Sequence, residues 1–514
     1  MSRDAVVIGA GPNGLAAAIR LAEAGRSVLV LEAADEPGGA VRTEELTLPG
    51  FRHDTFSSVY PAGAGSPVFA RMGLERHGLR WVQPEACYAH PLPDGTAVGL
   101  YRDVERTALS LDAVHRGDGD AWGAFVEPLL THFDALRATM LAGFPPVAGA
   151  LKLSRGLGPL GAARFATLAP ASARALGHRL FEGTGSRAWL YGSAGHSDVP
   201  PTSAGSAIAA AYLNLLGHAR GWPSPEGGAG RLTDALVGRL NELGGELRTG
   251  APVDRIEVSG GRVSGVQIAG GERIASGTVI ADVMPRALLA LAGEAISGPY
   301  RALAARYRYG PATIKVDWAL DGPIPWTGAA AREAGTVHVS GDEDEIVDTM
   351  AQTRRALPQR PYLLLGQQSL ADPSRAPAGK HTAWAYTHGP AAVDWSRESD
   401  RHVERIEAQV ERYAPGFRDR ILARSVLTPA ALERRNPNLV GGDVGGGSYV
   451  LRQVIFRPVP RLSPYRTPVA GLYLGSAATF PGGAVHGVSG DAAARAAIRD
   501  ADRARLRRRD RDRI

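Results

Sequence analysis

The chain has 514 residues, 44% of them hydrophobic, which is enough for more than one core and for two or three domains. A single cysteine excludes a disulfide framework and disulfide-exchange chemistry, and it fits a reducing compartment such as the cytoplasm. The net charge of +6 does not indicate nucleic-acid binding, because residues 499–514 contribute +4 of it (eight arginines and four aspartates) and no basic surface with interleaved aromatic residues accompanies them.

The first predicted elements form a strand–turn–helix–strand unit. Residues 5–8 (AVVI) are an apolar run typical of a buried parallel strand, residues 15–24 are rich in the helix formers Ala and Leu, and residues 27–31 (SVLVL) are a second buried strand. The turn between the first strand and the helix is GAGPNG, residues 9–14. In this context the GxGxxG pattern predicts a dinucleotide site, with the pyrophosphate at the helix N-terminus.

Glu32 ends the second strand, 23 residues after Gly9. A carboxylate at this place accepts hydrogen bonds from the adenosine ribose hydroxyls and repels a 2′-phosphate. The pattern therefore argues against NADP, and it leaves NAD and FAD as the dinucleotides that the first unit alone allows.

The residues after Glu32 favour one of these two cofactors. Residues 38–43 (GGAVRT) and 50–61 (GFRHDTFSSVYP) resemble the extended dinucleotide signature of the flavin amine oxidase and phytoene desaturase superfamily, in which a glutamate, a glycine pair and an arginine follow one another. The resemblance implies FAD, with the glycine pair and Arg42 along the diphosphate and toward the flavin. Non-covalent binding is expected, since Cys87 lies outside the flavin segments and His486 is expected to pack beside the ring.

Two later segments also resemble this superfamily. Residues 221–266 hold a predicted helix and two alternating strands, and residues 471–497 hold a strand, a glycine-rich loop and a helix whose dipole would face the pyrimidine end of the flavin. No metal ligands are assigned. The expected FAD contacts are Gly9, Gly11, Pro12, Asn13, Gly14, Glu32, Ala33, Gly38, Gly39, Arg42, Val253, Gly475, Gly482, Gly483, Gly487 and Val488.

Residues 367–390 and 436–460 resemble the phytoene dehydrogenase-related branch of the superfamily. The fold class expected from this resemblance is α/β, with a Rossmann-like FAD-binding domain of the glutathione reductase type and an inserted mixed α+β substrate domain. The FAD-binding domain would comprise residues 1–70, 221–285 and 435–500, the substrate or lid domain residues 71–220 and 286–434, and the basic tail residues 501–514. Within the inserted part, residues 357–378 are expected to be mainly a surface loop.

The sequence leaves open whether the protein contacts a membrane. We expect no signal peptide, because no basic segment with an apolar core precedes the first strand. No apolar stretch reaches the roughly 18 residues of a spanning helix. Residues 138–181, however, contain no acidic residue and spread five basic ones among apolar residues. This segment is either a basic amphipathic surface that lies on an anionic bilayer or a set of short lid helices with a solvated basic face.

Catalytic candidates are few, because the flavin itself accepts the hydride and the protein only has to place a C–H bond of the substrate over the ring. A catalytic triad is therefore not expected. Lys315 in TIKVDWAL resembles the lysine that holds a water at flavin N5 in flavin amine oxidases; its alternative is a solvated strand edge. His196, Asp198 and His218 are acid–base candidates or structural residues. Trp384, Tyr386 and His388 share one strand face and either line an apolar tunnel or fill a core. Arg452 and Arg457 either meet an acidic substrate group or the flavin phosphate or form surface pairs.

The function implied by the resemblance is FAD-dependent dehydrogenation or desaturation of a small lipophilic substrate, a polyene or isoprenoid of the carotenoid type. Three alternatives stay open: an FAD oxidase for amines or alcohols, a redox-neutral isomerase that uses reduced flavin, and an FAD-bound scaffold without turnover. The electron acceptor is not identified by any motif.

Overall fold

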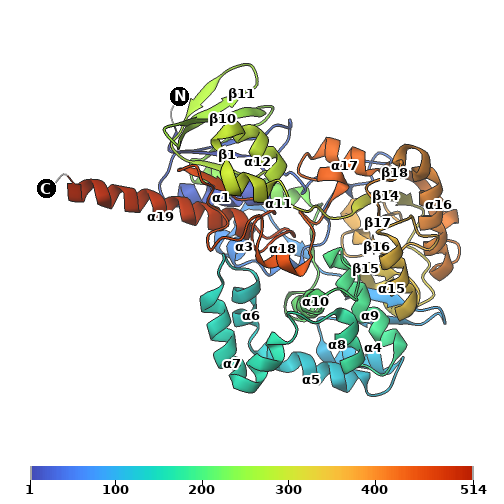
Figure 1. The fold of residues 1–514 in the computed structure, drawn as a ribbon. Coiled ribbons are helices and arrows are strands. Elements are labelled where there is room, and N and C mark those ends of the chain that lie inside the picture. Colours follow the sequence, from blue (N-terminus) through green and yellow to red (C-terminus); the bar gives the residue numbers. More distant parts are fainter. Residues whose placement is uncertain (1–2, 512–514) are drawn as a thin grey trace.

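The computed structural model describes residues 3–511, and its first layer is a five-stranded parallel sheet (Figure 1). The strand order is β19 (Leu472–Leu474), β13 (Val279–Ala281), β1 (Ala5–Ile8), β2 (Val28–Leu31) and β9 (Glu246–Arg248). The strands predicted at residues 5–8 and 27–31 are confirmed, and their apolar runs are explained by burial on both faces.

Successive residues of β1 and β2 enter two different cores. Val7 and Val30 pack under α1 (Pro12–Glu23), α11 (Gly230–Glu242) and α19 (Val488–Arg511). Val6 and Leu29 pack on the other face, against the antiparallel sheet β10 (Val253–Ser259), β11 (Arg262–Ile268) and β12 (Arg273–Ala275). This second core also takes in α12 (Pro285–Ala292) and α13 (Gly298–Ala304), so packing with the parallel sheet continues past residue 285, where the sequence placed a boundary.

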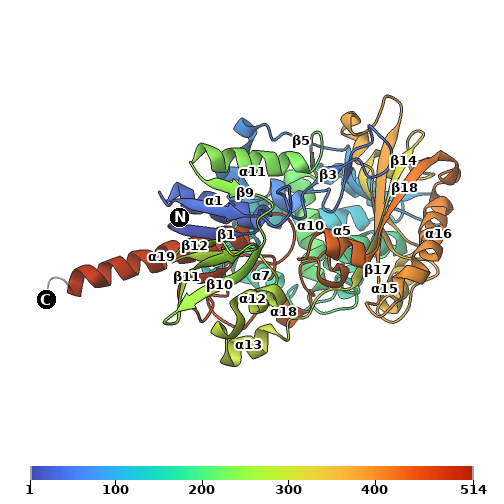
Figure 2. The same ribbon diagram turned by 90° about the horizontal axis from the view of Figure 1, so that it is seen from above.

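The second layer is a seven-stranded mixed sheet on the opposite side of the molecule (Figure 2). Its order is β18 (Ile421–Leu427), β14 (Ala312–Leu320), β17 (His381–Gly389), β16 (Leu363–Gly366), β15 (Ala334–Val339), β6 (Ala86–Pro91) and β7 (Ala97–Leu100). One face, which includes Val316 and Trp318, packs on α14 (Ala329–Glu333) and α16 (Trp395–Tyr413). The other face carries Lys315 and Tyr386, which are direct cross-strand neighbours.

The remaining helices cover the sheets and fill the space between them. They are α2 (Pro61–Ala64), α3 (Pro67–Met72), α4 (Val104–Asp112), α5 (Asp118–Thr131), α6 (Phe133–Met140), α7 (Val147–Ala166), α8 (Ala173–Leu180), α9 (Thr184–Ala194), α10 (Ser206–Arg220), α15 (Glu343–Gln352), α17 (Pro429–Arg435) and α18 (Leu451–Ile455). Two small strand pairs complete the fold. β3 (Thr43–Glu44) pairs with β4 (His53–Asp54), which follows it closely in the chain, whereas β5 (Trp81–Val82) and β8 (Ser224–Pro225) join distant segments.

One expectation about this layer was wrong. Residues 357–378 are not mainly a surface loop, because they contain β16, an inner strand of the seven-stranded sheet, and the buried side chain of Arg375. The leucines of β16 are buried on both faces, so the strand lacks the polar alternation that would have marked it in the sequence.

The C-terminal helix α19 begins under the parallel sheet and runs out beyond the body of the molecule (Figure 1). Its first half packs on α1, and Asp500 binds Arg466 at 2.7 Å. The basic tail expected at residues 501–514 is thus helical as far as Arg511, and residues 512–514 lie outside the described residues.

Candidate active site

A cavity of about 720 Å³ connects the two layers. At one end it is lined by Ile8 and Leu31, the last residues of β1 and β2, and by Asp282 directly after β13. At the other end it is lined by residues of α10 and by Tyr386 of β17. A cavity at the carboxyl ends of parallel strands is where open α/β folds bind their ligands.

The glycine cluster forms the floor of the first end. Gly9, Gly11, Pro12 and Asn13 line the cavity, and α1 begins at Pro12, so its free N–H groups point toward this space. Gly14 does not line the cavity: a Cβ there would lie 2.0 Å from the carbonyl oxygen of Gly9, so glycine is required for the turn to close. This is the arrangement in which a helix N-terminus binds a diphosphate.

Glu32 lies beside this floor with a fixed carboxylate. Its Oε2 accepts a hydrogen bond from Ala10 N–H at 2.7 Å, and its Oε1 accepts one from Ala34 N–H at 3.0 Å. Ala33 and Val253 line the same part of the cavity. Each carboxylate oxygen retains a further lone pair, so the side chain can still accept the two hydroxyls of a ribose.

Asp282 is a buried acid at this floor that the sequence analysis missed. Its Oδ2 accepts the Gly14 N–H at 2.8 Å. Burial raises the pKa of Asp282 to about 7, and this hydrogen bond opposes the shift. The sequence does contain a pattern that could have predicted this residue. Residues 278–282 (TVIAD) are an apolar run that ends in an acid, and the carboxyl end of a parallel strand faces the ligand.

The C-terminal glycine loop forms the opposite wall. Gly483 lines the cavity, and so does His486, whose Nδ1 accepts a hydrogen bond from Val488 N–H at 3.1 Å. Burial lowers the pKa of His486 to about 4, so the ring is neutral. Gly475 and Gly487 pack instead against Ile280 and Phe69, and they position the loop rather than lining it.

Five other predicted residues do not line the cavity, and one of them, Val488, is buried in the core that contains α1. Gly38 donates its N–H to the carbonyl of Ala10, and Gly482 lies behind the wall formed by its neighbour Gly483. Arg42 donates to the carbonyls of Gly39 at 3.3 Å and of Arg435 at 2.9 Å. Lys315 is buried and paired with Asp317, and it lies beside Tyr386 on the neighbouring strand. A buried ammonium requires such a partner, so Lys315 is not free to hold a water in the cavity.

The far end of the cavity has a polar wall made of His196, Asp198, Tyr386 and Tyr449. Asp198 binds His388, and His388 Nδ1 lies 3.1 Å from Thr313 Oγ1. His196 Nε2 lies 2.9 Å from His338 Nε2, and burial lowers the pKa of His196 to about 4, so the two rings form a neutral hydrogen-bonded pair. The predicted face of Trp384, Tyr386 and His388 is confirmed, with the first two rings stacked at 5.9 Å.

The other polar candidates lie outside this wall. His218 accepts the indole N–H of Trp122 at 3.0 Å and packs in the helical core. Arg452 is exposed on α18, whereas Arg457 is completely buried. Among residues 3–511, apart from the few with masked side chains, no group of three or more metal-ligating side chains is found.

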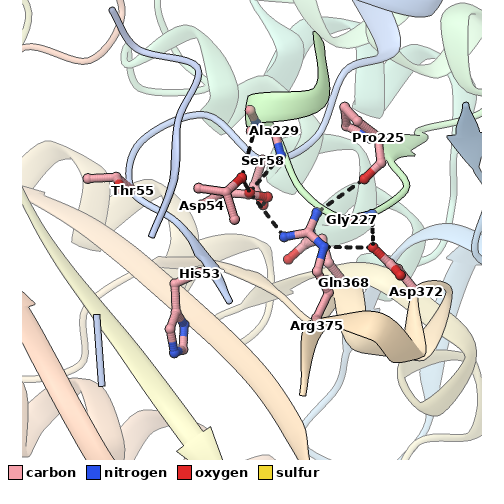
Figure 3. A network of polar contacts seen from close by, with 12 residues as sticks. His53, Asp54, Thr55, Ser58, Pro225, Gly227, Ala229, Gln368, Asp372 and Arg375 are labelled. Carbon is pink, nitrogen blue, oxygen red and sulfur yellow. Dashed lines mark hydrogen bonds and ion pairs between the residues drawn. The ribbon is translucent and has the colours of Figure 1, made fainter. Parts of the chain in front are cut away.

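A buried network joins the two layers beside the cavity (Figure 3). Asp54 accepts hydrogen bonds from Ser58 Oγ at 2.6 Å and Ala229 N–H at 2.8 Å, and it pairs with Arg375 at 3.0 Å. Arg375 also binds Asp372 at 2.7 Å. Since these residues come from three distant segments, the network fixes the N-terminal and middle parts of the first layer to the second layer.

Comparison with known proteins is consistent with this geometry. The family model of flavin-containing amine oxidoreductases matches residues 13–498. The chain belongs to this family. A rat pyridine nucleotide-disulfide oxidoreductase domain-containing protein 2 is 29% identical, over 97% of this chain and 93% of the relative, and a phytoene desaturase of Rhodobacter capsulatus is 25% identical, over 95% and 92%. An oxidoreductase structure from Methanosarcina mazei superposes with a TM-score of 0.64 at 18% identity, over 96% of this chain and 99% of that one.

These relatives place the flavoprotein in the phytoene desaturase-related branch, with the expected FAD-binding α/β fold. FAD is its non-covalent cofactor, and the site fits it: Glu32 suits the ribose, the N-terminus of α1 the diphosphate, and the cavity continues toward the polar wall. When bound, FAD supplies a hydride acceptor at flavin N5. The single cysteine, Cys87, is buried against Gly217 and is not among the residues that line the cavity.

Proposed function

We propose that this flavoprotein dehydrogenates a lipophilic substrate, most simply a C–C bond of a polyene or isoprenoid. The observation that carries the proposal is the apolar part of the cavity lining, much of which belongs to α10. This apolar part includes Met140, Leu141, Val199, Ile208, Leu213 and Leu216. An apolar wall of this kind gains free energy by removing hydrocarbon from water, about 25 cal/mol for each Å².

Dehydrogenation of a C–C bond requires two acceptors. One carbon would lose a hydride to the bound FAD, and the adjacent carbon would lose a proton to a base of the protein, so that the two electrons left on that carbon would form the double bond. Asp198 with His388 is the base that this cavity offers, because the carboxylate lines the cavity and the imidazole can share the proton. The apolar lining excludes water and keeps the substrate over the ring.

A second candidate function is oxidation of an amine or alcohol carried by a lipophilic body. The polar wall favours it, since Asp198 and Tyr386 can hold one nitrogen or oxygen at the end of an otherwise apolar space. The carboxylate of Asp198 would pair with an ammonium group or accept a hydroxyl proton, and the carbon next to that group would give the hydride.

The deciding experiment is the anaerobic visible spectrum of the purified flavoprotein before and after adding three probes: phytoene in detergent micelles, a long-chain alkylamine and a long-chain primary alcohol. Bleaching by phytoene supports desaturation, and bleaching by the amine or alcohol alone supports the second candidate. A redox-neutral isomerase would give a different result: the oxidised flavin bands persist with all three probes, and the protein with reduced flavin converts phytoene into a geometric isomer. No change of any kind would contradict both proposals and leave the scaffold alternative.

We also propose that the surface around α7 lies on an anionic membrane. Val147, Leu151 and Leu160 on this helix are large apolar side chains with exposed fractions of 64%, 48% and 65%. The segment holds only basic charges, all of them exposed: Lys152, Arg155, Arg164, Arg174 and Arg179. Met140 and Leu141 line the cavity just before α7, so a substrate could enter from this surface. None of the described helices is long and apolar enough to cross a bilayer.

A further inference from the structure

Arg457 is a completely buried arginine beside the C-terminal glycine loop. Its Nη2 donates to Tyr307 Oη and to the carbonyl oxygen of Gly446, both at 2.6 Å. Its Nε and Nη1 have no hydrogen-bond partner. A buried guanidinium with two unpartnered nitrogens, which carry three N–H donors, is costly, because each donor has lost its hydration without gaining an acceptor.

The charge of Arg457 also has no counter-ion within the described residues, where no carboxylate oxygen lies within 4.0 Å of the guanidinium. Asp443 lies in the same region, but its carboxylate accepts the N–H groups of Gly445 and Gly447 at 2.8 and 2.7 Å. The neighbouring phenol is not an anion either, since burial raises the pKa of Tyr449 to about 12. Arg375, which is also almost completely buried, has two carboxylate partners, Asp54 and Asp372.

The guanidinium lies directly behind the cavity wall. A Cβ at Gly482 would be 2.2 Å from Arg457 Nη1, so only glycine leaves room for this approach. The residues around it, Gly446, Gly483 and Tyr449, all line the cavity. The charge is therefore separated from the cavity by little more than backbone, and a low-dielectric surrounding screens it weakly.

The position along the cavity tells which part of FAD faces this charge. Adenosine belongs at Glu32 and the diphosphate at the N-terminus of α1, whereas the wall before Arg457 includes Tyr449, which also belongs to the polar end with Asp198. FAD extends from the first end to the second, and its reactive ring must lie nearest the substrate. The wall in front of Arg457 is thus on the ring side of the diphosphate.

We infer that Arg457 is the built-in counter-charge of the reduced flavin ring and sets the electron affinity of this flavoprotein. Two-electron reduction leaves the ring with negative charge, and a fixed cation behind the wall stabilises that state more than the neutral oxidised ring. The free energy lost by burying an unpaired charge in the oxidised protein is recovered when the ring accepts the hydride. This role does not depend on which substrate supplies the hydride.

The test is the midpoint potential of bound FAD, measured by anaerobic redox titration against a reference dye. Arg457→Gln and Arg457→Met should weaken the preference for reduced over oxidised FAD at least tenfold, which for a two-electron couple is a shift of about 30 mV to more negative potential. Arg457→Lys keeps the charge and should recover most of the shift. Arg452→Gln removes an exposed arginine five residues earlier and should leave the potential unchanged.

Each outcome decides the inference. The inference is overturned if the potential is unchanged in Arg457→Gln and Arg457→Met. It is also overturned if Arg457→Lys shifts the potential as much as Arg457→Gln does. Equal loss of affinity for oxidised and reduced FAD would assign the charge to the diphosphate and also overturns it. If the neutral variants do not fold, the wild-type protein decides: its bound FAD must have a more positive potential than free FAD titrated alongside, and an equal or more negative value overturns the inference.

Discussion

Asp198 Oδ1 and His388 Nε2 lie 2.8 Å apart although 190 residues separate them in the chain. Asp198 follows the short helix at Gly195–Ser197, in a left-handed conformation with φ of 55°, which is unfavourable for a residue with a side chain. Backbone strain of this kind persists only where the surrounding structure imposes it. The pair places a carboxylate in the cavity wall with an imidazole behind it, and this is the arrangement of a positioned base.

Replacement of Asp198 by asparagine tests this base. For the probe that bleaches the flavin, Asp198→Asn should reduce the rate of bleaching by about 10²–10⁴, the usual contribution of a general base. The content of bound FAD should not change, because Asp198 lies at the far end of the cavity from Glu32. Asp344→Asn, which alters an exposed acid on α15, is the matched control. A variant that bleaches at the wild-type rate would exclude Asp198 as the base.

Glu32 is the residue on which ribose recognition depends. Glu32→Ala should weaken FAD binding by about 1.5–3 kcal/mol, roughly ten- to a hundredfold in the dissociation constant, because charge-assisted hydrogen bonds are lost. Binding is measured by fluorescence titration of the apoprotein with FAD. Glu36→Ala removes an exposed glutamate in the same loop and should bind normally. Equal affinity of the two variants would contradict the ribose assignment.

Asp282 predicts a pH-dependent stability of the apoprotein. Its pKa rises from 3.8 in the unfolded chain to about 7 in the folded protein, so between these pH values the folded form holds a proton that the unfolded chain has released. The contribution of this group to stability therefore falls as the pH rises from about 4 to 7 and stays low above pH 7. Asp282→Asn retains an acceptor for Gly14 N–H and removes this loss.

The measurement is thermal unfolding of the wild-type apoprotein and Asp282→Asn between pH 4 and pH 8. The melting temperature of the variant should gain on that of the wild type as the pH rises. Buried neutral histidines such as His196 and His486 destabilise both proteins in acid alike, so their contribution cancels in the difference. A difference that does not change with pH would show that Asp282 titrates normally.

The sequence predicted those parts of the site that depend on neighbours in the chain. Residues 9–14 and Glu32 lie within one strand–turn–helix–strand unit, where spacing alone fixes which groups meet. The predicted α/β class and the elements around β10, β11 and β14 are confirmed for the same reason, because alternation and helix propensity are local signals.

The polar wall could not be predicted in this way. Asp198 meets His388 only because the fold brings the residue after the short helix Gly195–Ser197 next to β17. Lys315 meets Asp317 rather than the cavity because its strand is buried on both faces. The sequence left open whether Arg457 meets an acidic substrate group or the flavin phosphate or lies on the surface, and its complete burial was not predicted, since arginine is almost never fully buried without a partner. Such exceptions appear only when the packing is known.

Arg375 should be indispensable for joining the two layers. Arg375→Met leaves the carboxylates of Asp54 and Asp372 buried without their cation and should lower the free energy of unfolding by about 3–5 kcal/mol. Denaturant unfolding measures the change. Arg286→Met breaks an exposed ion pair with Glu433 and should cost about 1 kcal/mol or less. If the two variants were equally stable, the network in Figure 3 would be a peripheral contact.

The surface around α7 should bind vesicles through charge and apolar contact together. Sedimentation with phosphatidylserine-containing vesicles should recover the wild-type protein, whereas neutral phosphatidylcholine vesicles should recover less.

Replacing Lys152, Arg155 and Arg164 by glutamine should weaken binding by about 3 kcal/mol, at roughly 1 kcal/mol for each basic residue near an anionic surface. Leu151→Ser with Leu160→Ser should weaken binding to both vesicle types, because these side chains are exposed and enter the bilayer. Equal binding of the triple glutamine variant and the wild type, or binding of the wild type to neither vesicle, would contradict the membrane proposal and favour a solvated basic face on the lid helices.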